Sequence, residues 1–192
     1  MGGYFDNAGL FLIDTCFGLY ILVVLIRFLL QWLRADFYNP VSQFIVTVTN
    51  PPLRILRRFI PGLWGIDLAS VGLLLALSML KSWLLLSIIG HPTTFPGLLV
   101  YAIGQLLQLT VYVFIFTIFV RVILSWIAPY QGYNPVLRVL YDITEPIMAP
   151  ARRLIPPIAA LDISPIVVFV FLYLTLMLIV QPIIDFGLLL NR

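Results

Sequence analysis

The sequence has few charged residues and almost none of the histidine and cysteine side chains that bind transition metals. Of its 192 residues 10% are charged, and it has one histidine and one cysteine. The single cysteine, Cys16, excludes a disulfide framework or a four-thiolate metal site within one chain. The basic residues are too scattered to form a phosphate-binding face for nucleic acid. Protease, hydrolase and nucleotide-loop motifs are also missing, so we expect no enzyme, no cofactor and no nucleic-acid partner.

Apolar residues dominate the chain instead and make up 62% of it. Four runs, 10–33, 68–89, 98–127 and 166–184, are close to or above the ~20 residues that cross a hydrocarbon core of ~30 Å. Backbone polar groups find no water in lipid, so each run must be helical. We therefore predict an all-α membrane protein with four transmembrane helices.

One segment of the sequence occurs twice. Residues 39–67 and 134–162 share identical residues at an offset of 95, and two more identities lie upstream at an offset of 94. Many of these positions carry asparagine, proline, arginine or aspartate, which apolar composition does not explain, so we infer an internal duplication. The pairs are Asn39/Asn134, Pro40/Pro135, Val41/Val136, Thr49/Thr144, Pro51/Pro146, Arg57/Arg152, Arg58/Arg153, Ile60/Ile155, Pro61/Pro156, Asp67/Asp162, Arg27/Arg121 and Trp32/Trp126.

The duplication divides the chain into two repeats, 8–96 and 97–192. Each holds a transmembrane helix, an amphipathic segment (39–61 or 134–156) and a second transmembrane helix. Because each repeat crosses the membrane twice, both enter it in the same direction, as parallel pseudo-symmetric units. Most basic residues lie in the amphipathic segments. The positive-inside bias then predicts that these segments are cytoplasmic and that the N- and C-termini are outside.

Each amphipathic segment begins with an Asn-Pro pair, and Asn39 and Asn134 are expected to cap the helices that follow. Pro51 and Pro146 are expected to break these helices, with a second short helix after each break. The helices are predicted to lie in the headgroup layer or against the bundle. The apolar stripes are Val41, Phe44, Ile45 and Val48, and Val136, Val139, Leu140 and Ile143; the polar faces are Ser42, Gln43 and Thr47, and Arg138 and Asp142.

Two arginine pairs, Arg57-Arg58 and Arg152-Arg153, recur at the same place in both segments. Guanidinium groups at a membrane surface suit anionic lipid headgroups, at roughly 1 kcal/mol for each basic residue near the leaflet. The alternative is that these arginines only set the topology of the chain. We expect the bilayer and its anionic headgroups to be partners of the protein.

Arg27 and Arg121 lie near the ends of the first and third apolar runs, at the depth where Asp67 and Asp162 begin the second and fourth. An unpaired charge at membrane depth is costly, so the ion pairs Arg27–Asp67 and Arg121–Asp162 are expected. The alternative for each aspartate is a helix N-cap, which needs no charged partner.

Lys81 lies inside the second run, whereas leucine stands at the matching position of the second repeat. Asp14, Gln105, Gln108 and Gln181 occupy the outer halves of the other runs. An ionisable residue within a span is by default a functional candidate. We predict a polar cluster of Asp14, Lys81, Gln105 and Gln108, which Gln181 is able to join. The cluster either contacts an ion or solute or forms structural bonds between helices.

The doubled unit, Arg-x4-Trp followed by Asn-Pro, Thr-x-Pro, Arg-Arg-x-Ile-Pro and Asp, resembles the YggT family, also called YlmG-like. The two-copy form is similar to the bacterial inner-membrane branch. The resemblance implies a role in osmotic-shock resistance or ion homeostasis. For plastid relatives it implies cytochrome maturation and nucleoid or division organisation. It carries over no functional residues.

Two functions are therefore expected. The first is an ion path, or a modulator of one, which requires a homo-oligomer because four helices are too few to surround a wide pore. The second is a non-transporting scaffold or assembly factor that recruits a membrane protein through its amphipathic helices. Function should be sensitive at Asp14 and Lys81 in the first case, and at the amphipathic segments in the second.

Overall fold

The computed structural model describes residues 3–35, 38–62, 65–127, 134–154 and 162–191. Across these ranges the regular secondary structure is helical, and four stretches are long and apolar enough to cross a membrane. The predicted all-α membrane fold with four transmembrane helices is confirmed. The helices are α1 (Tyr4–Trp32), α2 (Pro40–Leu56), α3 (Leu68–Ile89), α4 (Phe95–Ile127), α5 (Pro135–Leu154), α6 (Ser164–Thr175) and α7 (Gln181–Leu189).

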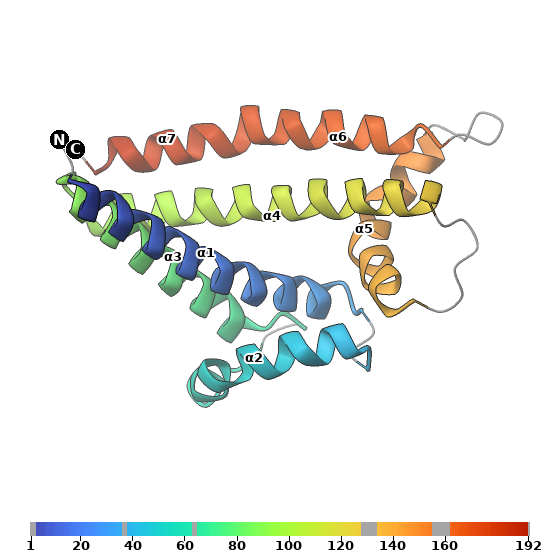
Figure 1. Ribbon diagram of the computed structural model, residues 1–192, viewed down its shortest axis with the longest axis horizontal. Coiled ribbons are helices and arrows are strands. Elements are labelled where there is room, and N and C mark those ends of the chain that lie inside the picture. Colours follow the sequence, from blue (N-terminus) through green and yellow to red (C-terminus); the bar gives the residue numbers. More distant parts are fainter. Residues whose placement is uncertain (1–2, 36–37, 63–64, 128–133, 155–161, 192) are drawn as a thin grey trace.

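The fourth span consists of α6 and α7 joined by a π-helical turn, η1 (Leu176–Val180). The three run as one rod (Figure 1). Pro182 has no N–H to donate to the carbonyl four residues before it, so the helix widens just ahead of this proline. Leu176, which matches Lys81 in the first repeat, opens the wide turn.

α1 begins and α7 ends at the same end of the bundle, the end where α3 connects to α4 (Figure 1). There the Thr94 N–H donates to Asn191 Oδ1 at 2.9 Å and the Thr94 hydroxyl to the Leu190 carbonyl at 2.8 Å. We call this the terminal end of the bundle. The ends of the long helices where α2 and α5 lie are the elbow end, and α2 and α5 are the elbow helices. Each repeat leaves the terminal end and returns to it, which confirms the predicted parallel arrangement.

The two spans of the second repeat pack backbone against backbone. A Cβ atom at Gly187 of α7 would lie 2.6 Å from the backbone nitrogen of Tyr101 in α4, and one at Gly104 would lie 2.6 Å from Ile184 Cγ1. Small residues allow membrane helices this close an approach.

The predicted caps of the elbow helices are confirmed. Asn39 Oδ1 accepts from the Val41 N–H at 2.9 Å, and Asn134 Oδ1 accepts from the Val136 N–H at 3.0 Å. Asn39 also donates through Nδ2 to the Pro135 carbonyl at 2.6 Å, so the start of one elbow helix is bonded to the start of the other.

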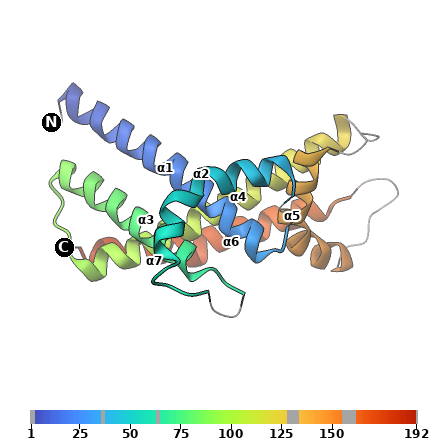
Figure 2. The same ribbon diagram turned by 90° about the horizontal axis from the view of Figure 1, so that it is seen from below.

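The prediction that Pro51 and Pro146 break these helices in two is wrong. Each elbow helix is continuous through its prolines, including Pro52 and Pro150. Figure 2 shows that both bend along their length. Pro51, Pro146 and Pro150 are exposed. A carbonyl that loses its partner on an exposed side can bond to water, so a bend is sufficient and a break is not required. Residues 155–161, which include Pro156, lie outside the described residues.

The buried stripe of α2 is also different from the predicted one. Phe44 is 66% exposed, whereas Ser42, assigned to the polar face, is fully buried together with Thr49 and Leu53. In α5 the predicted Val139, Leu140 and Ile143 are buried, while Val136 is half exposed. The elbow helices are rotated so that a buried threonine in each one faces the transmembrane bundle, and the next section gives the reason.

Candidate functional site

An ion pair lies within the membrane spans toward the terminal end. Lys81 Nζ of α3 is 2.7 Å from Asp14 Oδ1 of α1. The lysine side chain is 20% exposed and the aspartate side chain 63%. Gly18 lies beside the ammonium, where a Cβ would be in ordinary van der Waals contact with Nζ at 3.7 Å. Sequence reasoning placed the two charges at similar depth, and the structure brings them into contact.

This pair lines a cavity of about 530 Å³ between α1, α3 and α4. All four residues of the predicted polar cluster line it, because Gln105 and Gln108 of α4 face the ion pair across it. Gln181 does not line the cavity and donates instead to Asp185 Oδ1 at 3.0 Å. Polar residues that sequence reasoning missed complete the wall: Ser78, Ser82, Tyr101 and Tyr112.

The second repeat does not carry the ion pair. The position of Lys81 is taken by Leu176 and that of Asp14 by Gln108. The charges that line the cavity therefore belong to the first repeat.

A second hollow of about 500 Å³ follows toward the elbow end, between α1, α4 and the two elbow helices. Apart from Tyr112 and Thr117 its lining residues are aliphatic or phenylalanine, and no polar surface is open to it. Leu109 and Tyr112 line both hollows. In the part of the chain that the structure describes, the polar cavity therefore borders an apolar hollow at these two side chains.

At the elbow end, a buried arginine of α1 holds the first elbow helix. Arg27 is 4% exposed. Its Nη1 donates to Thr49 Oγ1 at 2.6 Å and to the Val46 carbonyl at 3.0 Å, and its Nη2 donates to Asn50 Oδ1 at 2.9 Å. The arginine therefore fixes the rotation of α2 that buries Thr49.

Arg121 repeats this arrangement in α4. It donates to Thr144 Oγ1 at 2.7 Å and to Glu145 Oε2 at 2.9 Å. Its guanidinium carbon also lies 3.9 Å from the centre of the Tyr141 ring, within cation–π distance. The threonines match across the duplication, so we describe each arginine–threonine contact as an elbow clasp.

The clasps correct the predicted ion pairs. Arg27 bonds to α2 rather than to Asp67, whose carboxylate is 2.5 Å from Arg57 Nη2 and also accepts from Ser70 at 2.6 Å. Arg121 bonds to α5 rather than to Asp162, which accepts from the Ser164 N–H at 2.9 Å. The elbow helices lie directly against the arginines, so nearer acceptors replace the aspartates.

Two carboxylates at the elbow end are held in the charged form. Burial alone would raise the pKa of Asp67, but hydrogen bonds from Arg57 and Ser70 and the charge of Arg57 outweigh it, and the pKa lies below its ordinary value. Burial would likewise raise the pKa of Glu145, but hydrogen bonds from Arg121 and Arg152 and the charges of both arginines lower it below its ordinary value.

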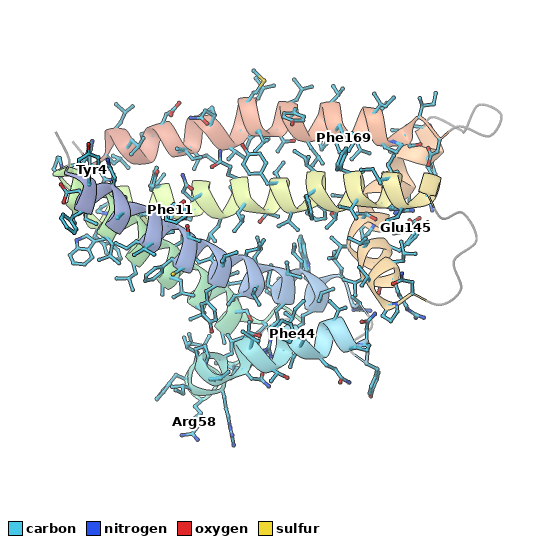
Figure 3. All side chains as sticks on the ribbon, in the orientation of Figure 1. Tyr4, Phe11, Phe44, Arg58, Glu145 and Phe169 are labelled. Atoms are coloured by element: carbon cyan, nitrogen blue, oxygen red, sulfur yellow. The ribbon has the colours of Figure 1, made fainter. Side chains whose placement is uncertain are left out.

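The arginine pairs are divided between the protein and its surroundings. Arg57 and Arg152 turn inward to Asp67 and Glu145. Arg58 is exposed and extends away from the bundle beneath α2 (Figure 3). Arg153 is exposed at the end of α5. Of the four predicted headgroup contacts, Arg58 and Arg153 are thus the two whose side chains reach outward.

No group of three side chains from histidine, cysteine, aspartate and glutamate gathers in the described residues, so they offer no protein site of that kind for a metal. The residues that gather are the Asp14–Lys81 pair at the terminal end and the arginine clasps at the elbow end.

Comparison with known proteins agrees with the duplicated architecture. The family model described as CCB3/YggT matches residues 7–88 and again 100–183. An uncharacterised protein of Pseudomonas aeruginosa is 43% identical over 178 residues, which cover 92% of this chain and 90% of that protein. A protein of Vibrio alginolyticus encoded in the region 3′ of proC is 43% identical over 173 residues, 85% of this chain and 89% of that one.

YggT of Escherichia coli K12 is 36% identical over 167 residues, which cover 87% of this chain and 86% of that protein. No solved structure matches. Two matches to the family model, placed on the two parallel repeats, and relatives that span nearly the whole chain confirm the resemblance seen in the doubled motif: the chain belongs to the CCB3/YggT family of multi-pass membrane proteins.

Proposed function

We propose that this chain acts in the inner membrane in osmotic-stress resistance or ion homeostasis, and that the cavity around Asp14 and Lys81 contacts the ion or polar solute involved. The observation that carries the proposal is an ion pair lining an open polar cavity of about 530 Å³ inside the spans. Charges within spans are rare and mark ion or solute pathways.

The polar cavity borders the apolar hollow at Leu109 and Tyr112. This arrangement favours binding or sensing by one chain over conduction through it. Conduction would require either that these two side chains move or that several chains surround a common path. In the second case we propose that the chains are copies of this one, in a homo-oligomer.

The test replaces the charges and measures survival of osmotic downshock. In a strain that lacks its own copy, Lys81→Met and Asp14→Asn are expected to lower survival at least tenfold relative to the native chain. Gln181→Leu is the matched control, because it removes a polar group from a span but lies outside the cavity. Native survival of the Lys81→Met and Asp14→Asn strains, at membrane levels equal to the native protein, contradicts the proposal.

A non-transporting scaffold is the second candidate, and the elbow helices favour it. They expose large apolar side chains to lipid or to a partner, among them Phe44 (Figure 3), which is 66% exposed, and Ile55, which is 62% exposed. Serine at both positions is then expected to abolish function while Lys81→Met has no effect. That pattern supports the scaffold, whereas the reverse pattern supports the solute contact.

We also propose that the elbow end is cytoplasmic and the terminal end outside. The support is that Arg54, Arg57 and Arg58 of the first repeat and Arg138, Arg152 and Arg153 of the second all lie at the elbow end. Alkaline phosphatase fused after the C-terminal residue is expected to be active, because it folds only outside the cytoplasm. Activity of a cytoplasmic reporter at the same position would reverse the orientation.

A further inference from the structure

The first repeat has a cavity at the elbow end that differs in chemistry from the other hollows. It encloses about 660 Å³ between the end of α1, the elbow helix α2 and the start of α3. Its polar lining consists of Arg27, Gln31, Arg57 and Asp67. The cavity is accessible, because the Arg57 side chain is 40% exposed. Two guanidinium groups and one carboxamide therefore face a space in which the only carboxylate of the described lining is Asp67.

The second repeat shows what is missing here. Glu145 accepts from Arg121 at 2.9 Å and also from Arg152, so one carboxylate joins the two guanidinium groups. At the matching position the first repeat has Asn50. The counterpart of Tyr141, whose ring lies against Arg121, is a valine.

As a result, the acceptors of Arg27 are all neutral: a threonine hydroxyl, a backbone carbonyl and the carboxamide of Asn50. Asp67 is bonded to Arg57 and Ser70. A charge that is 4% exposed is unfavourable unless an opposite charge compensates it. Compared with the second repeat, the first repeat lacks one negative charge at the same place, and a cavity lies beside it.

We propose that this cavity binds a phosphate group, which supplies the negative charge that Glu145 supplies in the second repeat. Guanidinium groups bind phosphate oxygens through paired, charge-assisted hydrogen bonds. Gln31 offers a further amide donor. The cavity lies at the end of a transmembrane helix, where the phosphodiesters of anionic phospholipids are found. The phosphate belongs either to such a lipid or to inorganic phosphate in solution, and the experiment separates these sources.

The decisive variant is Asn50→Glu. It restores to the first repeat the carboxylate that the second repeat accommodates at this position, and Asn50 is exposed, so the fold can accept it. The matched control is Gln43→Glu, which adds the same charge to an exposed position of the same helix, outside the cavity. Gln31→Glu places a carboxylate on the cavity lining itself and serves as a second variant if Asn50→Glu does not fold.

The full-length protein, purified in an uncharged detergent, is titrated with phosphatidylglycerol, phosphatidylcholine or potassium phosphate, with bound lipid counted by native mass spectrometry and Tm recorded. Phosphatidylglycerol is expected to bind and to raise the Tm of the native and Gln43→Glu proteins, with at least tenfold weaker binding to Asn50→Glu. Stabilisation by phosphatidylglycerol alone identifies a lipid site, and equal stabilisation by potassium phosphate identifies a site for soluble phosphate. The proposal is overturned if neither ligand binds, or if Asn50→Glu and Gln43→Glu bind alike.

Discussion

Arg27→Ala is expected to lower the free energy of unfolding by about 3 kcal/mol, because hydrogen bonds to a charged group contribute roughly 1.5–3 kcal/mol each and are not additive. The substitution leaves Thr49 Oγ1, the Val46 carbonyl and Asn50 Oδ1 without their common donor. It also leaves a space next to the buried stripe of α2. The first elbow helix should therefore detach from the bundle before the spans separate.

The measurement is unfolding in mixed micelles, with hydrogen exchange of α2 followed in parallel. Arg58→Ala is the control, since its side chain extends away from the bundle and surface substitutions usually change stability by less than about 0.5 kcal/mol. If Arg27→Ala were as stable as Arg58→Ala, and α2 were equally protected from hydrogen exchange in both, the Arg27 clasp would not be what holds α2 against the bundle.

Gly187→Ala is expected to destabilise the protein by more than about 2 kcal/mol, near the upper part of the range for overpacking. The added methyl carbon would lie 2.6 Å from the Tyr101 nitrogen and 2.8 Å from its Cα. These are backbone atoms, so relief requires α4 and α7 to move apart along their shared face.

Gly9→Ala is a control with the same substitution and the opposite expected effect on stability. Nothing lies within 4 Å of a Cβ at Gly9, which is in the helix α1. Removing a helical glycine there should stabilise the protein by about 0.5–1 kcal/mol. Both variants are compared by unfolding in micelles and by the yield of folded protein. Equal stability of Gly187→Ala and the native chain would mean that the two helices are farther apart than described.

The spans, the elbow caps and the polar cluster were predictable from sequence because each depends on local pattern or on depth. The length of an apolar run places a residue along the membrane normal, which was sufficient to place Lys81 and Asp14 at similar depth. The partners of Arg27 and Arg121 were not predictable in this way. They depend on the rotation of the elbow helices about their own axes, and the apolar stripe that sequence favoured would have placed Phe44 inward and Ser42 outward.

The prediction that prolines break the elbow helices failed for a related reason. A proline disfavours helix geometry in the residue before it, but its cost depends on which side of the helix loses its hydrogen bond. Pro51 and Pro146 are exposed, and sequence alone does not say so. Only the packing of α2 and α5 against the bundle determines which side is exposed.

The hydrogen bond from Asn39 to Pro135 has a consequence for how the duplicated halves diverged. Two separate single-repeat chains joined in this way would be bound by twofold symmetry, and every substitution would appear on both sides of the axis. Fusion into one polypeptide removes that constraint and keeps the contact between Asn39 and Pro135. One half is then free to carry Lys81 and a polar cavity. The other half is free to pack its helices closely at glycine and to carry Glu145, so that two halves of common origin differ in chemistry.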